Sequence, residues 1–263
     1  MNRLPSSDTW NTQTEITQSK GRQPQLSPFP SSLASNSPNA FFVPARYEKN
    51  YAYPLVVWLH HDGATEQQVS QVLPHVSVQN YVGVGIRGSR AADAAGHRYD
   101  WVQTAGGIAQ AEQSVMDAIE NASQRYSIHP ERVFIAGYKA GGTMAQRIAL
   151  RCPSQFAGVI SLGGGFPGGC RPLANLQQAR ELNMWMAFAT ECKEFSLDAM
   201  TDDLRLLNAA KMRVEVQQLE ASDEMLAPVL RQVDQWIMSL VTGQTQPRCV
   251  PDWDTVPVEF SAN

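Results

Sequence analysis

The sequence lacks both a strong charge of one sign and any long hydrophobic run. Its 21 Lys and Arg residues face 25 Asp and Glu, a formal net charge of -4. This balance gives no basic field that would neutralise many phosphates, so we expect no nucleic-acid partner. No segment approaches the roughly 18 consecutive apolar residues of a membrane helix, so we expect no membrane insertion. The residues after Arg3 are polar where a secretory signal would be apolar, which predicts a cytoplasmic location.

Close cysteine pairs are also missing. Cys152, Cys170, Cys192 and Cys249 are scattered along the chain, without the CxxC spacing of zinc sites or redox motifs. We therefore expect mostly free thiols, and the sequence calls for neither a metal ion nor a cofactor.

Three segments differ in composition. Residues 1–38 are rich in Ser, Pro, Gln, Asn and Thr and hold few large apolar residues, which predicts a disordered extension. Residues 39–242 contain the apolar runs of one folded domain. Residues 243–263 are broken by prolines and predict an irregular tail.

The central segment predicts an α/β fold. Short apolar runs of strand length recur through it. In most of them the odd and the even positions are both apolar, as in strands covered on both faces by helices. Helical spacing fills residues 108–122, 142–150 and 226–240 between and after these runs. The pattern predicts a doubly wound, mostly parallel sheet flanked by helices, with an antiparallel edge strand at 41–46. The six runs are residues 55–59, 81–86, 133–136, 159–162, 184–188 and 214–219.

A strand, a tight turn and a helix follow one another at residues 132–145, which read RVFIAGYKAGGTMA. Gly137 and Gly141 stand two residues before and two residues after Lys139, where close backbone approach requires them in a strained elbow. This segment resembles the GxSxGG nucleophile elbow of the α/β-hydrolase superfamily, in its esterase, carboxylesterase and polyhydroxybutyrate-depolymerase-like branch.

The resemblance extends over about three quarters of the chain, from about residue 41 to 241. Residues 51–63, YAYPLVVWLHHDG, are similar to the strand that leads into the family's oxyanion loop. Residues 126–137 and 153–164 resemble the segments before and after the elbow. Several segments that match in order imply the α/β-hydrolase fold.

The resemblance implies a catalytic serine, histidine and acid, but the matching positions carry other residues. Lys139 replaces the serine. In the late loop EASDEML, Asp223 stands where the histidine is expected, and all five histidines precede the elbow. The acid position is matched best by Cys192, with Glu191 and Glu194 as alternatives. The resemblance thus implies a degenerate triad at Lys139, Cys192 and Asp223.

This pattern favours a pseudoenzyme over a serine hydrolase, because nucleophile and base act as a unit and both are replaced. A lysine that attacked an ester would be left as a stable amide, and the carboxylate of Asp223 would favour its charged form. We expect Lys139 and Asp223 to form an ion pair. Two alternatives stay open: an ester hydrolase that uses an activated water or a non-standard nucleophile, and a structural or scaffold protein. Thr143 and Ser161 have hydroxyls near the elbow in sequence, but neither occupies its tip.

Backbone N–H groups of His61 and Ala140 are the candidate oxyanion-type donors, and with Lys139 they would bind a small acyl or anionic ligand. We expect His60 to support this loop. Adjacent side chains at a strand end point in opposite directions, which disfavours a metal site at His60 and His61.

Four further polar or aromatic residues are predicted near the carboxyl ends of the strands, where open α/β sheets bind ligands. For Trp101 we favour a place over the core, and for Arg87 and Arg90 solvated or ion-paired side chains, over a ligand-binding role. Asp100 belongs to the same group.

Overall fold

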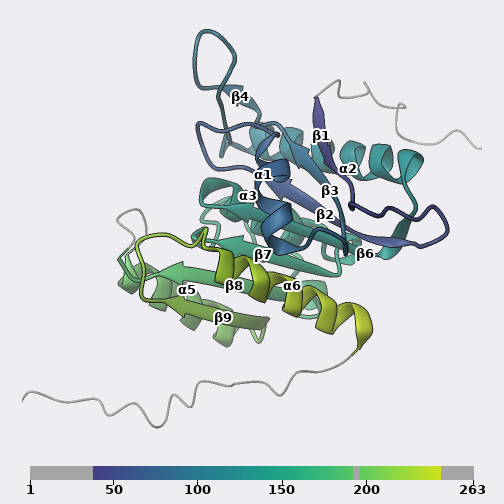
Figure 1. Ribbon diagram of the computed structural model, residues 1–263. Helices are drawn as coiled ribbons and strands as arrows, with labels where there is room; N and C mark the ends of the chain where they lie inside the picture. The colour runs from purple at the N-terminus through teal and green to yellow at the C-terminus, as the bar shows by residue number, and fades with distance from the viewer. Residues whose placement is uncertain (1–37, 192–195, 244–263) are drawn as a thin grey trace, which may run out of the picture. The chain divides into compact units, whose positions relative to one another are not determined.

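The computed structural model describes residues 38–191 and 196–243. Within them one mostly parallel sheet has the strand order β1-β3-β2-β6-β7-β8-β9, and β4 pairs with β5 in a separate hairpin (Figure 1). The strands are β1 (Asn39–Phe42), β2 (Tyr53–Leu59), β3 (Val82–Ile86), β4 (Arg90–Ala91), β5 (Tyr99–Asp100), β6 (Ile128–Tyr138), β7 (Gly158–Leu162), β8 (Asn183–Ala189) and β9 (Arg213–Leu219).

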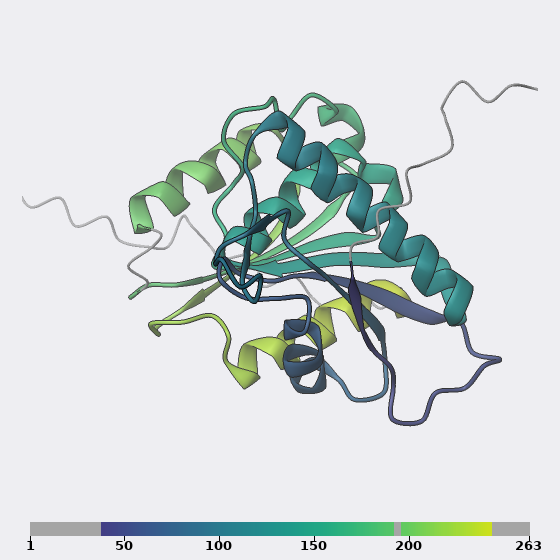
Figure 2. The ribbon, with the colours of Figure 1, turned by 90° about the horizontal axis from the view of Figure 1, so that it is seen from above.

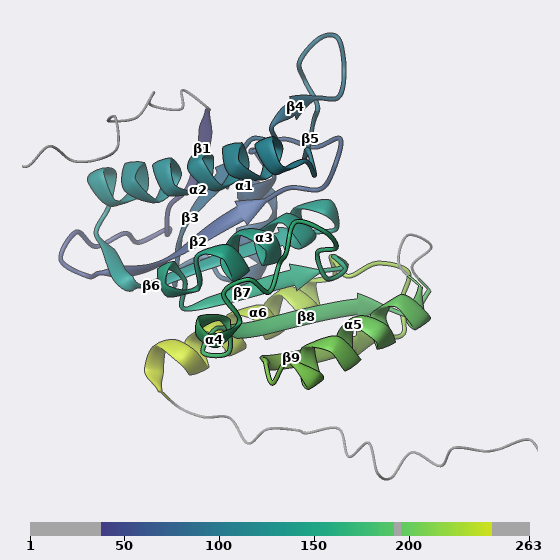
Figure 3. The same cartoon turned by 180° about the vertical axis from the view of Figure 1, so that it is seen from behind.

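Helices cover both faces of the sheet. Seen from above, the dark blue and yellow helices, α1 and α6, lie on one face, and α2, α3 and α5 lie on the other (Figure 2). The view from behind shows α2, α3 and α5 across the second face, with the short α4 beside α3 (Figure 3). The helices are α1 (Gln68–Val76), α2 (Ala105–Arg125), α3 (Ala140–Arg151), α4 (Leu176–Ala179), α5 (Leu197–Ala209) and α6 (Ala227–Thr242).

Each face of the sheet has its own apolar core. Alternate side chains of one strand enter opposite cores: Val57 packs with the core under α2 and α3, while Val56 and Trp58 pack with the core under α1 and α6. All seven residues of β2 are buried. Burial on both faces explains why the strand sequences are apolar throughout rather than alternating.

The carboxyl ends of β2 and β6 meet at the middle of the sheet. After β2 the chain adds β3 on one side, and it then crosses back to place β6 on the other side of β2. Leu59 at the end of β2 pairs in parallel with Gly137 near the end of β6. Such a switch point leaves a crevice outside the strand ends, which is where ligands bind in open α/β sheets.

The sequence predictions of fold class, six strands and three helices are confirmed. The antiparallel edge strand exists as β1 at 39–42, opposite β3, a few residues before the predicted place. The helices α1 and α5 and the hairpin β4–β5 were not predicted; Pro74 inside α1 weakens its helical signal.

The predicted extension at 1–38 and the predicted tail at 243–263 lie outside the described residues except for their single inner residues, 38 and 243. Among the described helices, none has the length and apolar character needed to cross a bilayer.

The first turn of α3 presses directly against the end of β2. A Cβ built on Gly141 would lie 2.2 Å from the carbonyl oxygen of Leu59 and 2.3 Å from that of His60. A Cβ built on Gly137 would lie 2.4 Å from the backbone of Gly141. The two glycines therefore allow a contact between backbones that any side chain would prevent, as the sequence predicted.

Replacing Gly141 by Ala is expected to lower the free energy of unfolding by about 3 kcal/mol, because the added methyl group meets backbone atoms that cannot turn away. Gly106 in α2 is the matched control, since its Cβ would meet nothing within 4 Å. Gly106→Ala should stabilise the protein by about 0.5 to 1 kcal/mol. Urea unfolding of the two variants measures both changes, and equal effects would contradict the close contact.

Candidate functional site

Lys139 occupies the tip of a strained elbow between β6 and α3. Its φ of 49° and ψ of -118° are unusual for a residue with a side chain. The backbone fixes this conformation, because the Lys139 N–H donates to the carbonyl of Leu162 at 2.7 Å and its own carbonyl accepts from the Thr143 N–H at 3.0 Å. The side chain is half-buried, with Nζ 5.3 Å from the centroid of the Tyr138 ring. The elbow expected from the sequence is thus formed with a lysine at its tip.

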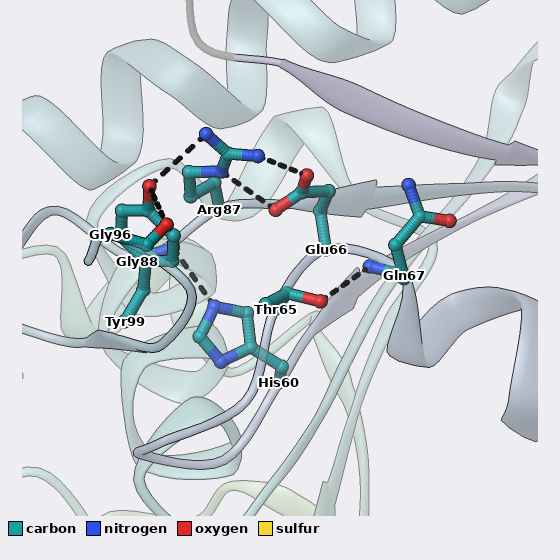
Figure 4. A network of polar contacts seen from close by, with 8 residues as sticks. All are labelled: His60, Thr65, Glu66, Gln67, Arg87, Gly88, Gly96 and Tyr99. Carbon is teal, nitrogen blue, oxygen red and sulfur yellow. Dashed lines mark hydrogen bonds and ion pairs between the residues drawn. The ribbon is translucent and has the colours of Figure 1, made fainter. Parts of the chain in front are cut away.

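The loop after β2 is held from within by His60, which is fully buried. The Gly88 N–H donates to His60 Nε2 at 2.9 Å (Figure 4). Nδ1 therefore carries the proton and donates to the carbonyl of His61 at 2.7 Å. Burial lowers the pKa of His60, which keeps the ring neutral. The Trp101 indole donates to the His60 carbonyl at 2.7 Å. His60 and Trp101 therefore have the structural roles that the sequence favoured.

A buried ion pair braces the same loop at its far end. Both carboxylate oxygens of Glu66 accept hydrogen bonds from Arg87, whose third nitrogen donates to the hydroxyl of Tyr99 (Figure 4). Burial alone would raise the pKa of Glu66, but the hydrogen bonds from Arg87 hold it below its usual value. The preference for an ion-paired Arg87 is confirmed, and Arg90 pairs with Asp100 at 3.2 Å.

The imidazole of His61 is oriented by a chain of two hydrogen bonds. Trp58 Nε1 donates to Gln68 Oε1 at 3.0 Å, which leaves Gln68 Nε2 to donate to His61 Nδ1 at 2.8 Å. The neutral ring therefore carries its proton on Nε2. The ring meets Tyr138 edge to face, with centroids 5.4 Å apart. Gln68 was not identified from the sequence, because its role depends on the register of α1 against β2.

The two predicted oxyanion-type donors lie at the same edge of the sheet. His61 follows the end of β2, and Ala140 is the first residue of α3; both are half-buried. The N–H groups in the first turn of a helix are unused by the helix itself and carry its positive dipole end. The role of these donors in ligand binding stays a prediction.

Asp223 lies in the loop between β9 and α6, but its partner is not the one expected. Its Oδ2 accepts from the Tyr138 hydroxyl at 2.8 Å, and its Oδ1 accepts from the Met225 N–H at 2.7 Å. The ion pairs among the described residues do not include Lys139 with Asp223. The predicted ion pair is not among the described contacts of Asp223, whose carboxylate bonds to the neighbouring tyrosine and to a local turn instead.

Glu224, which the sequence analysis passed over, is the buried carboxyl group of this site. Only 1 % of its surface is exposed. One oxygen accepts from the Ala189 N–H at 2.9 Å, at the end of β8, and Oε2 finds no hydrogen-bond partner in the described chain. That oxygen packs against Gly163: a Cβ built on this glycine would lie 2.5 Å from it. The φ of Gly163 is +64°. The position of Glu224 beside Asp223 in the sequence did not indicate that its side chain is buried.

The charge of Glu224 is set by opposing neighbours. Burial raises its pKa most, and the carboxylate of Asp223 raises it further. The Ala189 N–H and the charge of Lys139 act in the opposite direction. Lys139 therefore interacts electrostatically with the glutamate of this loop, next to the aspartate that the sequence analysis chose.

The hydroxyl groups nearest the elbow in sequence are used in structural hydrogen bonds. Thr143 donates to the carbonyl of Gly165 at 2.9 Å. Ser161 is 1 % exposed, donates to the carbonyl of Gly164 at 3.0 Å and accepts from Gln146. Both side chains therefore bond to the glycine-rich loop after β7.

The triad acid position lies at the end of β8. Cys192 and Glu194, two of its three candidates, lie outside the described residues. Glu191, the third, is exposed, and its N–H donates to the carbonyl of Ala221. Assignment of the acid to Cys192 stays a prediction.

Glu224→Gln is expected to raise the free energy of unfolding at pH 7 by about 1 kcal/mol, because it removes a buried charge while Oε1 can still accept from Ala189. The pKa of Glu224 is near 4.5 in the unfolded chain and higher in the folded protein. The wild type therefore loses stability as the pH rises from the first of these values through the second. The gain should therefore shrink at pH 4.

Denaturant unfolding at both pH values measures this difference. Glu220→Gln is the matched control, since Glu220 is exposed in the same loop and should change stability little. A gain for Glu224→Gln that is the same at pH 4 and pH 7 would exclude an ionised, buried carboxylate as its cause.

Comparisons with known proteins agree with this geometry. The model of the phospholipase/carboxylesterase family matches residues 51–180, which run from β2 through the elbow to α4. A search of curated proteins finds no match.

Solved structures share the fold at low sequence identity. A carboxylesterase from Bacillus cereus is 14 % identical with a TM-score of 0.61, over 78 % of this chain and 95 % of that one. A Mesorhizobium loti carboxylesterase is 14 % identical with a TM-score of 0.62, over 80 % and 98 %. The S-formylglutathione hydrolase of Staphylococcus aureus is 11 % identical with a TM-score of 0.54, over 71 % and 81 %. The chain thus has an α/β-hydrolase fold, and its residues 51–180 match the phospholipase/carboxylesterase family model.

Proposed function

We propose that this protein is a pseudoenzyme that has lost serine-hydrolase turnover and uses the elbow site to bind a small acyl or other anionic ligand. The observation that carries the proposal is the lysine at the tip of an otherwise complete elbow. Lys139 has the backbone conformation of a nucleophile position, yet its side chain cannot perform the serine reaction.

The length of the lysine side chain opposes acyl transfer at this position. Its amine lies three bonds farther from the backbone than a serine oxygen would. An acyl group attached there would be displaced from donors such as the Ala140 N–H, which sit beside the elbow backbone. The product would also be an amide, which is much harder to hydrolyse than the ester.

The two histidines of the loop after β2 do not offer a general base beside the tip. His60 is neutral with both ring nitrogens in use, and His61 Nδ1 accepts a hydrogen bond from Gln68 Nε2. Asp223, at the position expected for the histidine, accepts from Tyr138 and Met225. Loss of both nucleophile and base costs about a millionfold in rate in a serine hydrolase.

Structural contacts hold the loop that would donate to an oxyanion. The loop that carries the His61 N–H is braced by His60, Trp101 and the Glu66–Arg87 pair. The positive end of α3 and the ammonium of Lys139 favour a negative group in the same place. A carboxylate, which resembles the product of ester hydrolysis, fits this combination of charge and donors.

The alternative is an ester hydrolase with a non-standard nucleophile, which the family match and the esterase-like fold support. Thr143 and Ser161 are poor nucleophile candidates, because both hydroxyls donate to carbonyls of the loop after β7. A third alternative is a scaffold protein, in which the Lys139 side chain fills the former site.

Purified wild-type protein is expected to show no turnover of short-chain p-nitrophenyl esters above that of Lys139→Ala, which controls for contaminating esterase. Lys139→Ser alone should stay inactive because the base is missing. Lys139→Ser combined with Asp223→His should exceed the wild-type rate by about 10-fold or more, since nucleophile and base act together. Turnover by the wild type that disappears in Lys139→Ala would make this lysine catalytic and overturn the proposal.

Butyrate is expected to bind the wild type, measured by titration calorimetry or by chemical shifts of the protein. Lys139→Met should weaken this binding about 5-fold, because one favourable charge interaction of about 1 kcal/mol is removed. Lys211→Met, at an exposed position after α5, is the matched control and should leave the affinity unchanged. Equal affinities of wild type and Lys139→Met would exclude the lysine as the anion's partner.

A further inference from the structure

The imidazole of His61 carries a hydrogen-bond donor that the protein orients but does not use. Its Nδ1 accepts from Gln68 Nε2 at 2.8 Å, so the proton of the neutral ring is on Nε2. Among the described residues, none accepts a hydrogen bond from this nitrogen. The ring is half-buried, and Nε2 is not one of the fully buried atoms that lack a partner. The donor is therefore open to a ligand.

Two buried side chains set the orientation of this ring. Trp58 and Gln68 are 2 % and 9 % exposed, and the indole N–H, which can only donate, bonds to Gln68 Oε1 at 3.0 Å. A flipped Gln68 amide would place two donors face to face in the interior, which is costly. The amide is thus fixed with its Nε2 toward His61. The protein holds His61 in one tautomer and one orientation, as preorganised binding groups are held.

The imidazole of His61 lies beside the elbow. Its ring meets the Tyr138 ring edge to face, with centroids 5.4 Å apart, and Lys139 Nζ lies 5.3 Å from the centroid of the same ring. The backbone N–H of His61 is also the candidate oxyanion-type donor after β2. One residue therefore presents two donors to a ligand at the elbow, one from its main chain and one from its side chain.

The charges around His61 favour a neutral acceptor as the partner of Nε2. Asp62 is the next residue, and Asp223 accepts from the hydroxyl of Tyr138 at 2.8 Å. Both carboxylates repel a second negative group near the imidazole, and the neutral ring has no charge that would offset this repulsion. A keto or hydroxyl oxygen accepts a hydrogen bond without bringing a charge.

We propose that the His61 imidazole selects small carboxylates that carry a second, neutral oxygen acceptor, as keto acids and hydroxy acids do. This inference rests on the proposed function: the carboxylate of the ligand lies at the backbone donors and Lys139, and its second oxygen accepts from His61 Nε2. Gln68 is a positioning residue, because it acts through the tautomer of His61. A site with such a donor disfavours analogues that leave the donor unpaired.

Titration calorimetry on the full chain tests the selection with four five-carbon acids: pentanoate, 2-oxopentanoate, 4-oxopentanoate and pentanedioate. At least one of the two keto acids should bind the wild type about 5-fold more tightly than pentanoate, the effect of one hydrogen bond. Pentanedioate, whose second group is charged, should show no such gain.

Two histidine variants show whether the preference comes from the imidazole. His61→Phe keeps an aromatic ring beside Tyr138 but lacks the donor, so the ratio of keto-acid affinity to pentanoate affinity should fall to about 1. His75→Phe, at an exposed position of α1, is the matched control and should keep the wild-type ratio.

The positioning role of Gln68 has a spectroscopic readout. Proton–nitrogen correlation spectra of the imidazole rings should show His61 with its proton on Nε2, a signal identified by its loss in His61→Phe. This signal should shift more with the preferred keto acid than with pentanoate. Gln68→Met, with its folding checked by circular dichroism, should give a mixture of tautomers and a smaller keto-acid preference.

The failure of this inference is distinguishable from the failure of the proposed function. Pentanoate binding that depends on Lys139, without a keto-acid preference or with one that persists in His61→Phe, would overturn the selection by His61 alone. A protein that binds none of the four acids would overturn ligand binding at the elbow as well.

Discussion

The contact between the first turn of α3 and the end of β2 is the constraint on which the site depends. Two glycines let the backbone of the helix lie against the carbonyls of Leu59 and His60. This contact brings the positive end of α3 to the switch point of the sheet and leaves Lys139 in the sharp turn between β6 and α3. The loop after β2 and the elbow are thereby fixed relative to each other by main-chain atoms, with little help from the side chains that would carry out chemistry.

The sequence predicted what depends on local spacing. Buried strands are apolar on every position, and Gly137 and Gly141 flank Lys139 at fixed distances, so the sheet and the elbow could be recognised from neighbours in the chain. Contacts between distant segments could not. The hydrogen bond from Tyr138 to Asp223 spans 85 residues, so nothing in the sequence indicated this partner of the aspartate. Glu224 packs against Gly163, which follows β7, and bonds to Ala189 at the end of β8.

The buried charged side chains of this fold differ in how completely they are hydrogen-bonded. Glu66 and Arg87 satisfy each other with paired hydrogen bonds, and they brace a loop. Glu224 accepts one hydrogen bond, from the Ala189 N–H, and Arg147 donates one, to the carbonyl of Gly168. The other buried polar atoms of both side chains have no partner in the described chain. Half-satisfied groups of this kind cost stability, and Glu224 lies in the same loop as Asp223. The Glu66–Arg87 pair stabilises the fold, whereas Glu224 and Arg147 reduce its stability.

The strained conformation of Lys139 also bears on how such a protein can change over time. The φ of 49° is imposed by hydrogen bonds of the main chain to Leu162 and Thr143 and by the flanking glycines, none of which involves the lysine side chain. The fold therefore tolerates different residues at the tip at nearly the same energetic cost. Chemistry at this position can be lost by exchanging a single side chain while the scaffold persists, so architecture and activity are free to evolve separately.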